Sequence, residues 1–208
     1  MASRRWWALA AVLVAVIAVV AVAASRGGGG GTAAAGPSPS AAAQQAPALA
    51  SADTAANGQP VDGIQCQTDE QVLYHIHAHL AVYVNGAART IPEGIGIPPP
   101  RQVEQTPDGP FVVGGKCYYW LHSHTADGII HIESPTQRIY TLGNWFDIWQ
   151  QPLSSTQVGP ATGTVIAYVN GQRYTGDVRT IALNVHTVIQ LDVGTDVAPK
   201  PYIFPAGL

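Results

Sequence analysis

The chain of 208 residues is 47% hydrophobic and 11% charged, with a formal net charge of −3 at neutral pH. This length allows one or two domains, and the weak negative charge without an extended Lys or Arg run argues against nucleic acid as a partner. The sequence also lacks a nucleophilic-serine elbow and a nucleotide-binding fingerprint. Gly94-Ile95-Gly96 has neither the third glycine nor the strand-to-helix context of such a fingerprint.

The N-terminal residues 1–24 predict a transmembrane anchor or a signal peptide. Arg4-Arg5 precedes an unbroken apolar run over residues 6–24. As a helix with a rise of about 1.5 Å per residue, this run reaches roughly 28 Å, close to the thickness of the hydrocarbon core of a bilayer. We expect a single-pass cell-membrane protein whose C-terminal domain lies outside the cytoplasm. Cleavage after Ala21-Val22-Ala23, followed by secretion, is the alternative.

Residues 25–60 consist mainly of Gly, Ala, Pro, Ser and Gln, including consecutive glycines over residues 27–31. A segment without large apolar residues cannot offset its chain entropy, so we expect a disordered linker here. The folded extracytoplasmic β domain then comprises residues 61–208, a common size for a single core.

The two cysteines, Cys66 and Cys117, both lie in the part of the chain that we expect to be exported. In an oxidising compartment such a pair predicts a disulfide bond, with a pair of thiolate metal ligands as the alternative. Each cysteine precedes a histidine-rich stretch, so the bridge would tether the two stretches.

The first histidine-rich stretch, His75-Ile76-His77-Ala78-His79, lies in a predicted strand over residues 71–84. Because side chains alternate between the faces of a strand, its three histidines share one face and the apolar residues take the other. Asn85-Gly86 is a hairpin turn signal, after which residues 88–91 return as a strand. Residues 92–110 are rich in Pro and Gly and predict an irregular loop.

Residues 112–113 and 118–125 predict further strands, and the second histidine-rich stretch covers residues 121–133. A two-residue turn at Asp127-Gly128 would place His124 opposite His131 and His122 opposite Glu133. A four-residue loop would instead pair His122 with His131. In both registers three imidazoles and a carboxylate lie on one face of the hairpin.

Thr141 predicts the N-cap of a helix that runs to about Gln150, with an apolar face made by Leu142, Trp145, Phe146 and Trp149. Strands over residues 164–169, 180–183 and 186–193 follow. The sequence therefore predicts a mainly β fold, an antiparallel sandwich or open barrel with one short helix.

Histidines at alternate positions of one strand, with a third on a neighbouring strand, can complete a tetrahedral metal site. We expect metal ligands from the two stretches, with His75 at the rim: His75, His77, His79, His122, His124 and His131. Glu133 can serve as a ligand, as an acceptor for a ring N–H, or as a catalytic base. The alternative is a polar outer face of a sheet, which is also our interpretation of the lone His186.

The only methionine is Met1 and the cysteines are expected to bond to each other, so the soft ligands that select Cu(I) are absent. Imidazole with a carboxylate suits Zn(II), Cu(II), Ni(II) or Fe(II). The predicted cofactor is Zn(II), the commonest of these, or Cu(II), because the site is expected to lie outside the cytoplasm. The favoured function is an extracytoplasmic metal-binding domain that captures or delivers metal at the membrane. A metal-dependent hydrolase or oxidoreductase with Glu133 as general base is the second hypothesis. A non-metal interaction module of the cell envelope is the third, and protein partners are not predicted.

The chain resembles a family of uncharacterised exported or membrane-anchored prokaryotic His-rich proteins. The resemblance is carried by the stretch over residues 75–80, by residues 91–97, and by the second stretch from Trp120 to Ser134. It extends through the helix and covers most of residues 71–193. The resemblance implies that the two histidine-rich stretches act as one unit, and it implies no reaction.

Overall fold

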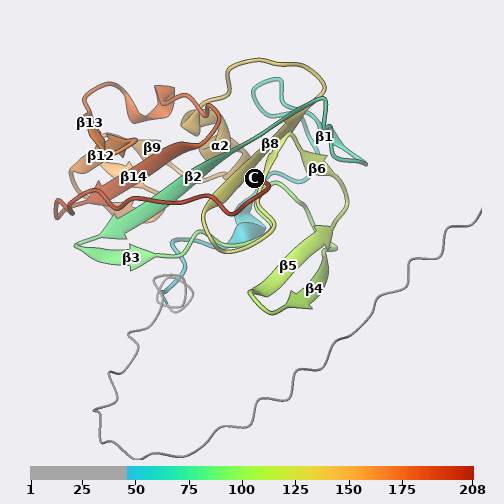
Figure 1. Ribbon diagram of the computed structural model, residues 1–208, viewed down its shortest axis with the longest axis horizontal. Coiled ribbons are helices and arrows are strands. Elements are labelled where there is room, and N and C mark those ends of the chain that lie inside the picture. Colours follow the sequence, from blue (N-terminus) through green and yellow to red (C-terminus); the bar gives the residue numbers. More distant parts are fainter. Residues whose placement is uncertain (1–45) are drawn as a thin grey trace, which may run out of the picture. The chain divides into compact units, whose positions relative to one another are not determined.

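The computed structural model describes residues 46–208 (Figure 1). The predicted anchor at residues 1–24 and most of the predicted linker lie outside this range. Within the described range, no helix combines the length and the apolar character needed to span a bilayer.

The fold is built on an open seven-stranded sheet that has β13 at one edge and β7 at the other. In spatial order its strands are β13 (Gln172–Tyr174), β12 (Val165–Val169), β14 (Thr187–Val193), β2 (Tyr74–Val84), β8 (Ile129–Ser134) and β7 (Leu121–His122), with β3 (Ala87–Arg89) beside the end of β2. All neighbours are antiparallel except β14 and β2, which are parallel. The expectation of a purely antiparallel sheet is therefore wrong. The long connection between these two strands provides the crossover that parallel pairing requires.

The predicted alternation of β2 is confirmed. Ala78, Leu80 and Val82 are buried on the core face, and the histidines lie on the opposite face. Across β2, the core face of β8 adds Ile130 and Ile132, which are fully buried. Burial of one apolar face fixes the strand register, because a slip by one residue would turn every histidine into the core.

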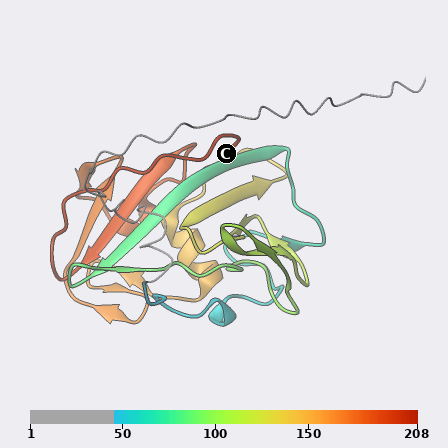
Figure 2. The ribbon, with the colours of Figure 1, turned by 60° about the horizontal axis from the view of Figure 1, so that its bottom comes forward.

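The predicted helix is confirmed as α2 (Leu142–Trp149). The Thr141 side chain accepts a hydrogen bond from the Asn144 backbone N–H, and the Asn144 side chain accepts one from the Thr141 backbone N–H. This capping box starts the helix, and Gln150 ends it in a left-handed conformation. Trp145 and Trp149 are fully buried in the same hydrophobic core as the apolar residues of β2 and β8. Figure 2 shows the ribbon of α2 beside the sheet that contains these strands.

The remaining elements form smaller sheets and two 3₁₀ helices. They are η1 (Ala52–Thr54), β1 (Cys66–Gln67) paired with β6 (Tyr118–Tyr119), β4 (Gln102–Thr106) paired with β5 (Gly109–Gly114), the three-stranded group of β9 (Leu153–Ser154), β10 (Gln157–Val158) and β11 (Ala161–Thr162), and η2 (Val178–Thr180). The mainly β class with one short α-helix is thus confirmed for the described residues, as several sheets.

The strand pairing around the second histidine-rich stretch follows the four-residue alternative. His122 lies opposite His131, so the favoured pairing of His124 with His131 is wrong. Ser123 instead exchanges hydrogen bonds with a neighbouring loop: its N–H donates to the carbonyl of Ile95, and its carbonyl accepts from the N–H of Gly94. This loop draws residues 123 and 124 away from β8.

Two local predictions are also corrected. Residues 92–110 are not wholly irregular, because β4 begins at Gln102 and returns as β5 through the turn sequence Thr106-Pro107-Asp108-Gly109. β5 consequently belongs to a separate hairpin and does not continue the main sheet. Residues 180–183 make only an isolated bridge from Ala182 to Thr141, because the chain first turns through η2.

The folded domain begins before the predicted boundary at Val61. Leu49 is buried, and its N–H donates to the carbonyl of Thr90, beside β3. Ala52 and Ala56 are also buried, and the Trp149 indole donates to the Ser51 carbonyl. Residues 46–60 therefore pack on the core through small side chains and backbone hydrogen bonds, which composition alone did not indicate.

Cys66 and Cys117 form the predicted disulfide, with their Cα atoms 5.4 Å apart and 51 residues apart in the chain. The bridge fastens β1 to the segment that enters β6 and β7.

We expect the Cys66→Ala, Cys117→Ala double variant to lose about 4 kcal/mol of unfolding free energy, because closing a loop of this length restricts the unfolded chain. Denaturant titration of the oxidised protein, the reduced protein and the variant measures this loss. An unchanged midpoint in the variant would show that the bridge does not stabilise the domain.

Candidate metal centre

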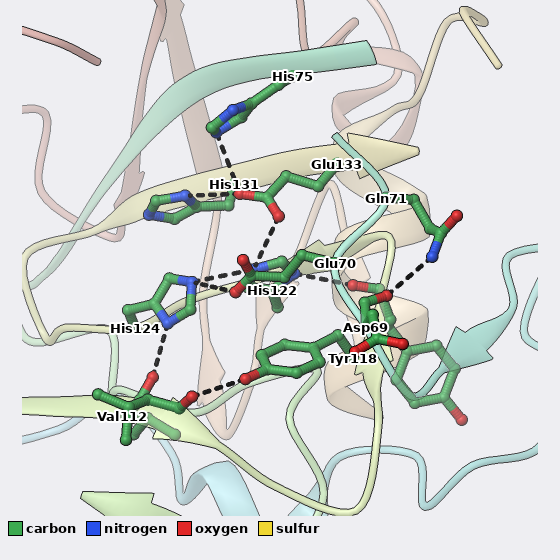
Figure 3. Close-up of polar contacts among 12 residues, drawn as sticks. Asp69, Glu70, Gln71, His75, Val112, Tyr118, His122, His124, His131 and Glu133 are labelled. Atoms are coloured by element: carbon green, nitrogen blue, oxygen red, sulfur yellow. Dashed lines mark hydrogen bonds and ion pairs between the residues drawn. The ribbon is translucent and has the colours of Figure 1, made fainter. Parts of the chain in front are cut away.

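Three adjacent strands bring the histidines together on the face of the sheet opposite the core. The register pairs His77 of β2 with His131 of β8, and His131 with His122 of β7. His75 lies opposite Glu133. Residues from the two distant stretches therefore converge as predicted, and Figure 3 shows their side chains directed toward one another.

His122 and His124 form the inner pair, whose Nε2 atoms lie 3.1 Å apart. The Nδ1 atom of His122 lies 2.8 Å from the Tyr119 carbonyl, and that of His124 lies 2.6 Å from the Val112 carbonyl. A carbonyl only accepts, so each Nδ1 carries the proton and each Nε2 presents a lone pair to the other. Two facing lone pairs form no hydrogen bond, and a cation between them satisfies both.

The inner pair is held in an almost closed environment. Both rings are buried, with His122 fully so. Phe111 stacks on His124 at a centroid distance of 4.8 Å, and Tyr118 contacts the edge of His122. The β4–β5 hairpin thus supplies both an apolar wall and the carbonyl that orients His124, although sequence reasoning gave it no role.

His75, His77 and His131 form the outer triad. The Nε2 atom of His77 lies 3.1 Å from both the Nε2 atom of His75 and the Nδ1 atom of His131. The His75 side chain is 41% exposed, as expected for a residue at the rim, whereas His77 is buried. The outer triad therefore connects the buried inner pair with solvent.

Glu133 lies between the outer triad and the inner pair. Its Oε1 atom is 3.0 Å from His75 Nε2 and 3.4 Å from His131 Nδ1, and its Oε2 atom is 3.9 Å from His122 Nε2. Burial by itself would raise the pKa of this carboxyl, but its hydrogen bond to His131 and the charges of His122 and His75 lower the pKa to about 2. The carboxylate is thus the ionised form at neutral pH.

Glu70, in the segment between β1 and β2, is a member that sequence reasoning missed. Its Oε1 atom lies 3.3 Å from His124 Nε2 and 3.9 Å from His122 Nε2 (Figure 3). Burial, followed by the charge of Glu133, raises the pKa of Glu70. In the sequence, Glu70 is only an acidic residue shortly before the first histidine-rich strand, and this position alone does not indicate a metal ligand.

His79 does not join the cluster, although it was predicted as a ligand. Its Nε2 atom donates to the carbonyl of Asp127 in the loop before β8, and its ring stacks on Tyr202 at 3.5 Å between centroids. The His186 backbone N–H donates to the His77 carbonyl, but its ring lies outside the cluster, stacked on Phe204 and hydrogen-bonded to the Leu208 carbonyl. The C-terminal segment therefore packs against both His79 and His186, a contact that the sequence did not predict.

The buried histidines favour the neutral state in the metal-free protein. Burial, reinforced for two of them by neighbouring imidazoles, lowers the pKa of His77 and of His79 to about 4 and that of His122 to about 3. An unfolded histidine has a pKa of about 6.5. The unfolded chain therefore binds more protons than the folded chain below this pH.

We expect the metal-free protein to be most stable above pH 6.5 and to lose unfolding free energy as the pH falls toward 4. The slope is about 1.4 kcal/mol per pH unit for each histidine that only the unfolded state protonates. Urea titrations of chelator-treated protein at several pH values measure this slope. A midpoint independent of pH across this interval would contradict the neutral assignment.

These positions define a cluster that can hold a metal ion. Ligand atoms of His122, His124, His131 and Glu133 all lie within 4.8 Å of one another, and those of the outer triad do so as well. Comparisons of the chain with protein-family models, with curated proteins and with solved structures give no match. The cluster itself has the geometry of a His/Glu group that can hold a metal ion.

Proposed function

We propose that the protein is an extracytoplasmic metal-binding protein that captures or delivers Zn(II) or Cu(II) at the membrane. The inner pair is the observation that carries this proposal. Two backbone carbonyls fix both Nδ1 protons, so two Nε2 lone pairs meet at 3.1 Å beside a buried carboxylate. About 3.3 Å separates two donors of a tetrahedral ion with bonds of about 2.0–2.1 Å, so this spacing suits a shared metal ion.

The rival to a metal ion is a proton shared between the two Nε2 atoms. Burial and the neighbouring imidazoles lower the pKa of His122, and burial lowers that of His124. Protonation of the inner pair is therefore disfavoured near neutral pH. A divalent cation held by imidazoles and a carboxylate better satisfies these groups.

Imidazole and carboxylate donors favour Zn(II), Cu(II), Ni(II) or Fe(II) over Cu(I), which prefers sulfur ligands. Both cysteines are bonded to each other, so no thiolate competes for the metal within the described residues. The disulfide also supports an oxidising compartment outside the cytoplasm. The apolar run at residues 6–24 then supplies the membrane attachment.

The enzyme hypothesis assigned Glu133 the role of general base. Glu133 lies within 4 Å of His75, His122 and His131, and only 3% of the residue is exposed. These contacts favour a ligand over a free base that meets a substrate. Capture or delivery of metal is therefore preferred to catalysis.

Metal analysis of the full-length protein tests the proposal. After purification without chelators, we expect bound Zn or Cu by elemental mass spectrometry. Removal of the metal should lower the melting temperature, and returning Zn²⁺ at a hundredfold excess over its dissociation constant should restore about 2.7 kcal/mol. The proposal is wrong if the purified protein carries no metal and its melting temperature does not change on addition of Zn²⁺ or Cu²⁺. The envelope interaction module would then be the remaining hypothesis.

A further inference from the structure

We propose that the cluster is a binuclear centre, in which the Glu133 carboxylate bridges two divalent transition-metal ions. This inference rests on the proposed function and adds a second ion to it. The outer ion is bound by the outer triad of His75, His77 and His131. The inner ion is bound by the inner pair together with Glu70.

The cluster contains more donors than one tetrahedral ion can use. Five imidazoles and two carboxylates converge, whereas a zinc ion in a protein takes about four ligands. A single ion at the inner pair would leave His75 and His77 unused as ligands, with only a 3.1 Å hydrogen bond between their Nε2 atoms. With two ions, all five imidazoles and both carboxylates can serve as ligands.

Neighbouring donors within each proposed site have the spacing of one coordination sphere. His131 lies within 4.8 Å of both donor sets, and we assign it to the outer ion because its Nδ1 atom is 3.1 Å from His77 Nε2. In the outer triad, the Nε2 atom of His77 lies 3.1 Å from a nitrogen of each neighbour. In the inner pair the Nε2 atoms are 3.1 Å apart, and Glu70 Oε1 is 3.3 Å from that of His124. These separations are close to the ~3.3 Å between donors around a tetrahedral ion.

Glu133 faces both groups with different oxygen atoms. Its Oε1 atom contacts the outer triad, at 3.0 Å from His75 Nε2 and 3.4 Å from His131 Nδ1. Its Oε2 atom is buried, has no hydrogen-bond partner among residues 46–208 and lies 3.9 Å from His122 Nε2. A buried carboxylate oxygen without a donor is costly. An inner metal ion satisfies it, and the same carboxylate then spans the roughly 3.5–4 Å typical of two-metal sites.

The experiment counts the ions bound by the metal-free full-length protein after equilibrium dialysis against Zn²⁺. We expect two per chain in the wild type and one in the His75→Ala, His77→Ala variant, which removes two of the three outer histidines and leaves the inner pair. His186→Ala is the matched control and should bind two, because His186 contacts Phe204 and the Leu208 carbonyl outside the cluster.

Each result separates the binuclear centre from the proposed function. One zinc ion in the wild type, unchanged in the His75→Ala, His77→Ala variant, would overturn the second ion and leave a mononuclear metal protein. No zinc and no copper in the wild type would overturn both proposals. Two in the wild type and one in the variant supports the bridged pair of sites.

A measurement on the unmodified protein covers the case in which the variant fails to fold. Wild-type protein loaded with Cu²⁺ to saturation should give an electron paramagnetic resonance spectrum of a coupled pair, with less integrated intensity than the bound copper and a half-field transition. Full intensity for all bound copper, without a half-field transition, would show separate ions and overturn the Glu133 bridge.

Discussion

The His122→Ala, His124→Ala double variant is expected to weaken metal binding at the inner site, lowering the affinity by about 10⁴- to 10⁶-fold. A structural zinc ion contributes roughly 10–16 kcal/mol shared over about four ligands, so two ligands account for about half of it. The loss follows from the geometry, because these are the two rings whose Nε2 lone pairs are fixed by the Tyr119 and Val112 carbonyls. Isothermal titration with Zn²⁺ and the metal-dependent rise in melting temperature measure the effect.

His79→Ala is the matched control for this variant. His79 lies on the same face of β2 and is also buried, but its Nε2 atom donates to the Asp127 carbonyl and its ring stacks on Tyr202. We expect His79→Ala to lower the melting temperature of the metal-free protein while keeping the affinity for Zn²⁺. Equal losses of affinity in both variants would show that the affinity depends on general packing of this face and not on the inner pair.

The Gly96→Ala variant is expected to destabilise the domain by about 3 kcal/mol and to weaken metal binding. Gly96 has φ +73°, and a Cβ added there would collide with the Leu121 carbonyl and lie 3.0 Å from the Cβ of His122. A left-handed conformation costs a residue with a side chain about 1–2 kcal/mol, and the collision adds overpacking of about 1–3 kcal/mol. Relief of the collision moves Leu121 and His122, so the inner pair is displaced as well.

Gly171→Ala separates strain from collision in this prediction. Gly171 has φ +76°, but an added Cβ there meets no atom within 4 Å. It lies in the turn between β12 and β13, away from the cluster. We expect Gly171→Ala to lower the melting temperature by less than Gly96→Ala and to leave Zn²⁺ affinity unchanged. Equal effects of the two variants on both quantities would refute the role of the Gly96 loop in positioning His122.

The loop around Gly96 has a structural role that no sequence motif indicates. Gly94-Ile95-Gly96 does not match a nucleotide-binding fingerprint, yet its backbone pairs with Ser123, between the two histidines of the inner pair. It also accepts a hydrogen bond at the Gly96 carbonyl from the Tyr119 N–H. The glycine is required by close backbone approach, which is visible only once the two segments are placed together.

Features that depend on neighbouring residues could be predicted from the order of the amino acids. Alternation along β2 predicted which face carries His75 and His77, since strand periodicity is a local property. The capping pattern at Thr141 predicted α2, and Asn85-Gly86 predicted a turn in which both residues have positive φ. The two cysteines predicted the disulfide because no other partner was available in the chain.

Which of these groups meet became visible only in the folded chain. The pairing of Ser123 with residues 94–95 selected the register in which His122 faces His131. Glu70 and the Val112 carbonyl contact His124 from other segments of the chain. Asp127 and Tyr202, also distant in sequence, hold His79 outside the cluster. Periodicity and turn chemistry report on a few adjacent residues, whereas a ligand set is fixed by long-range packing.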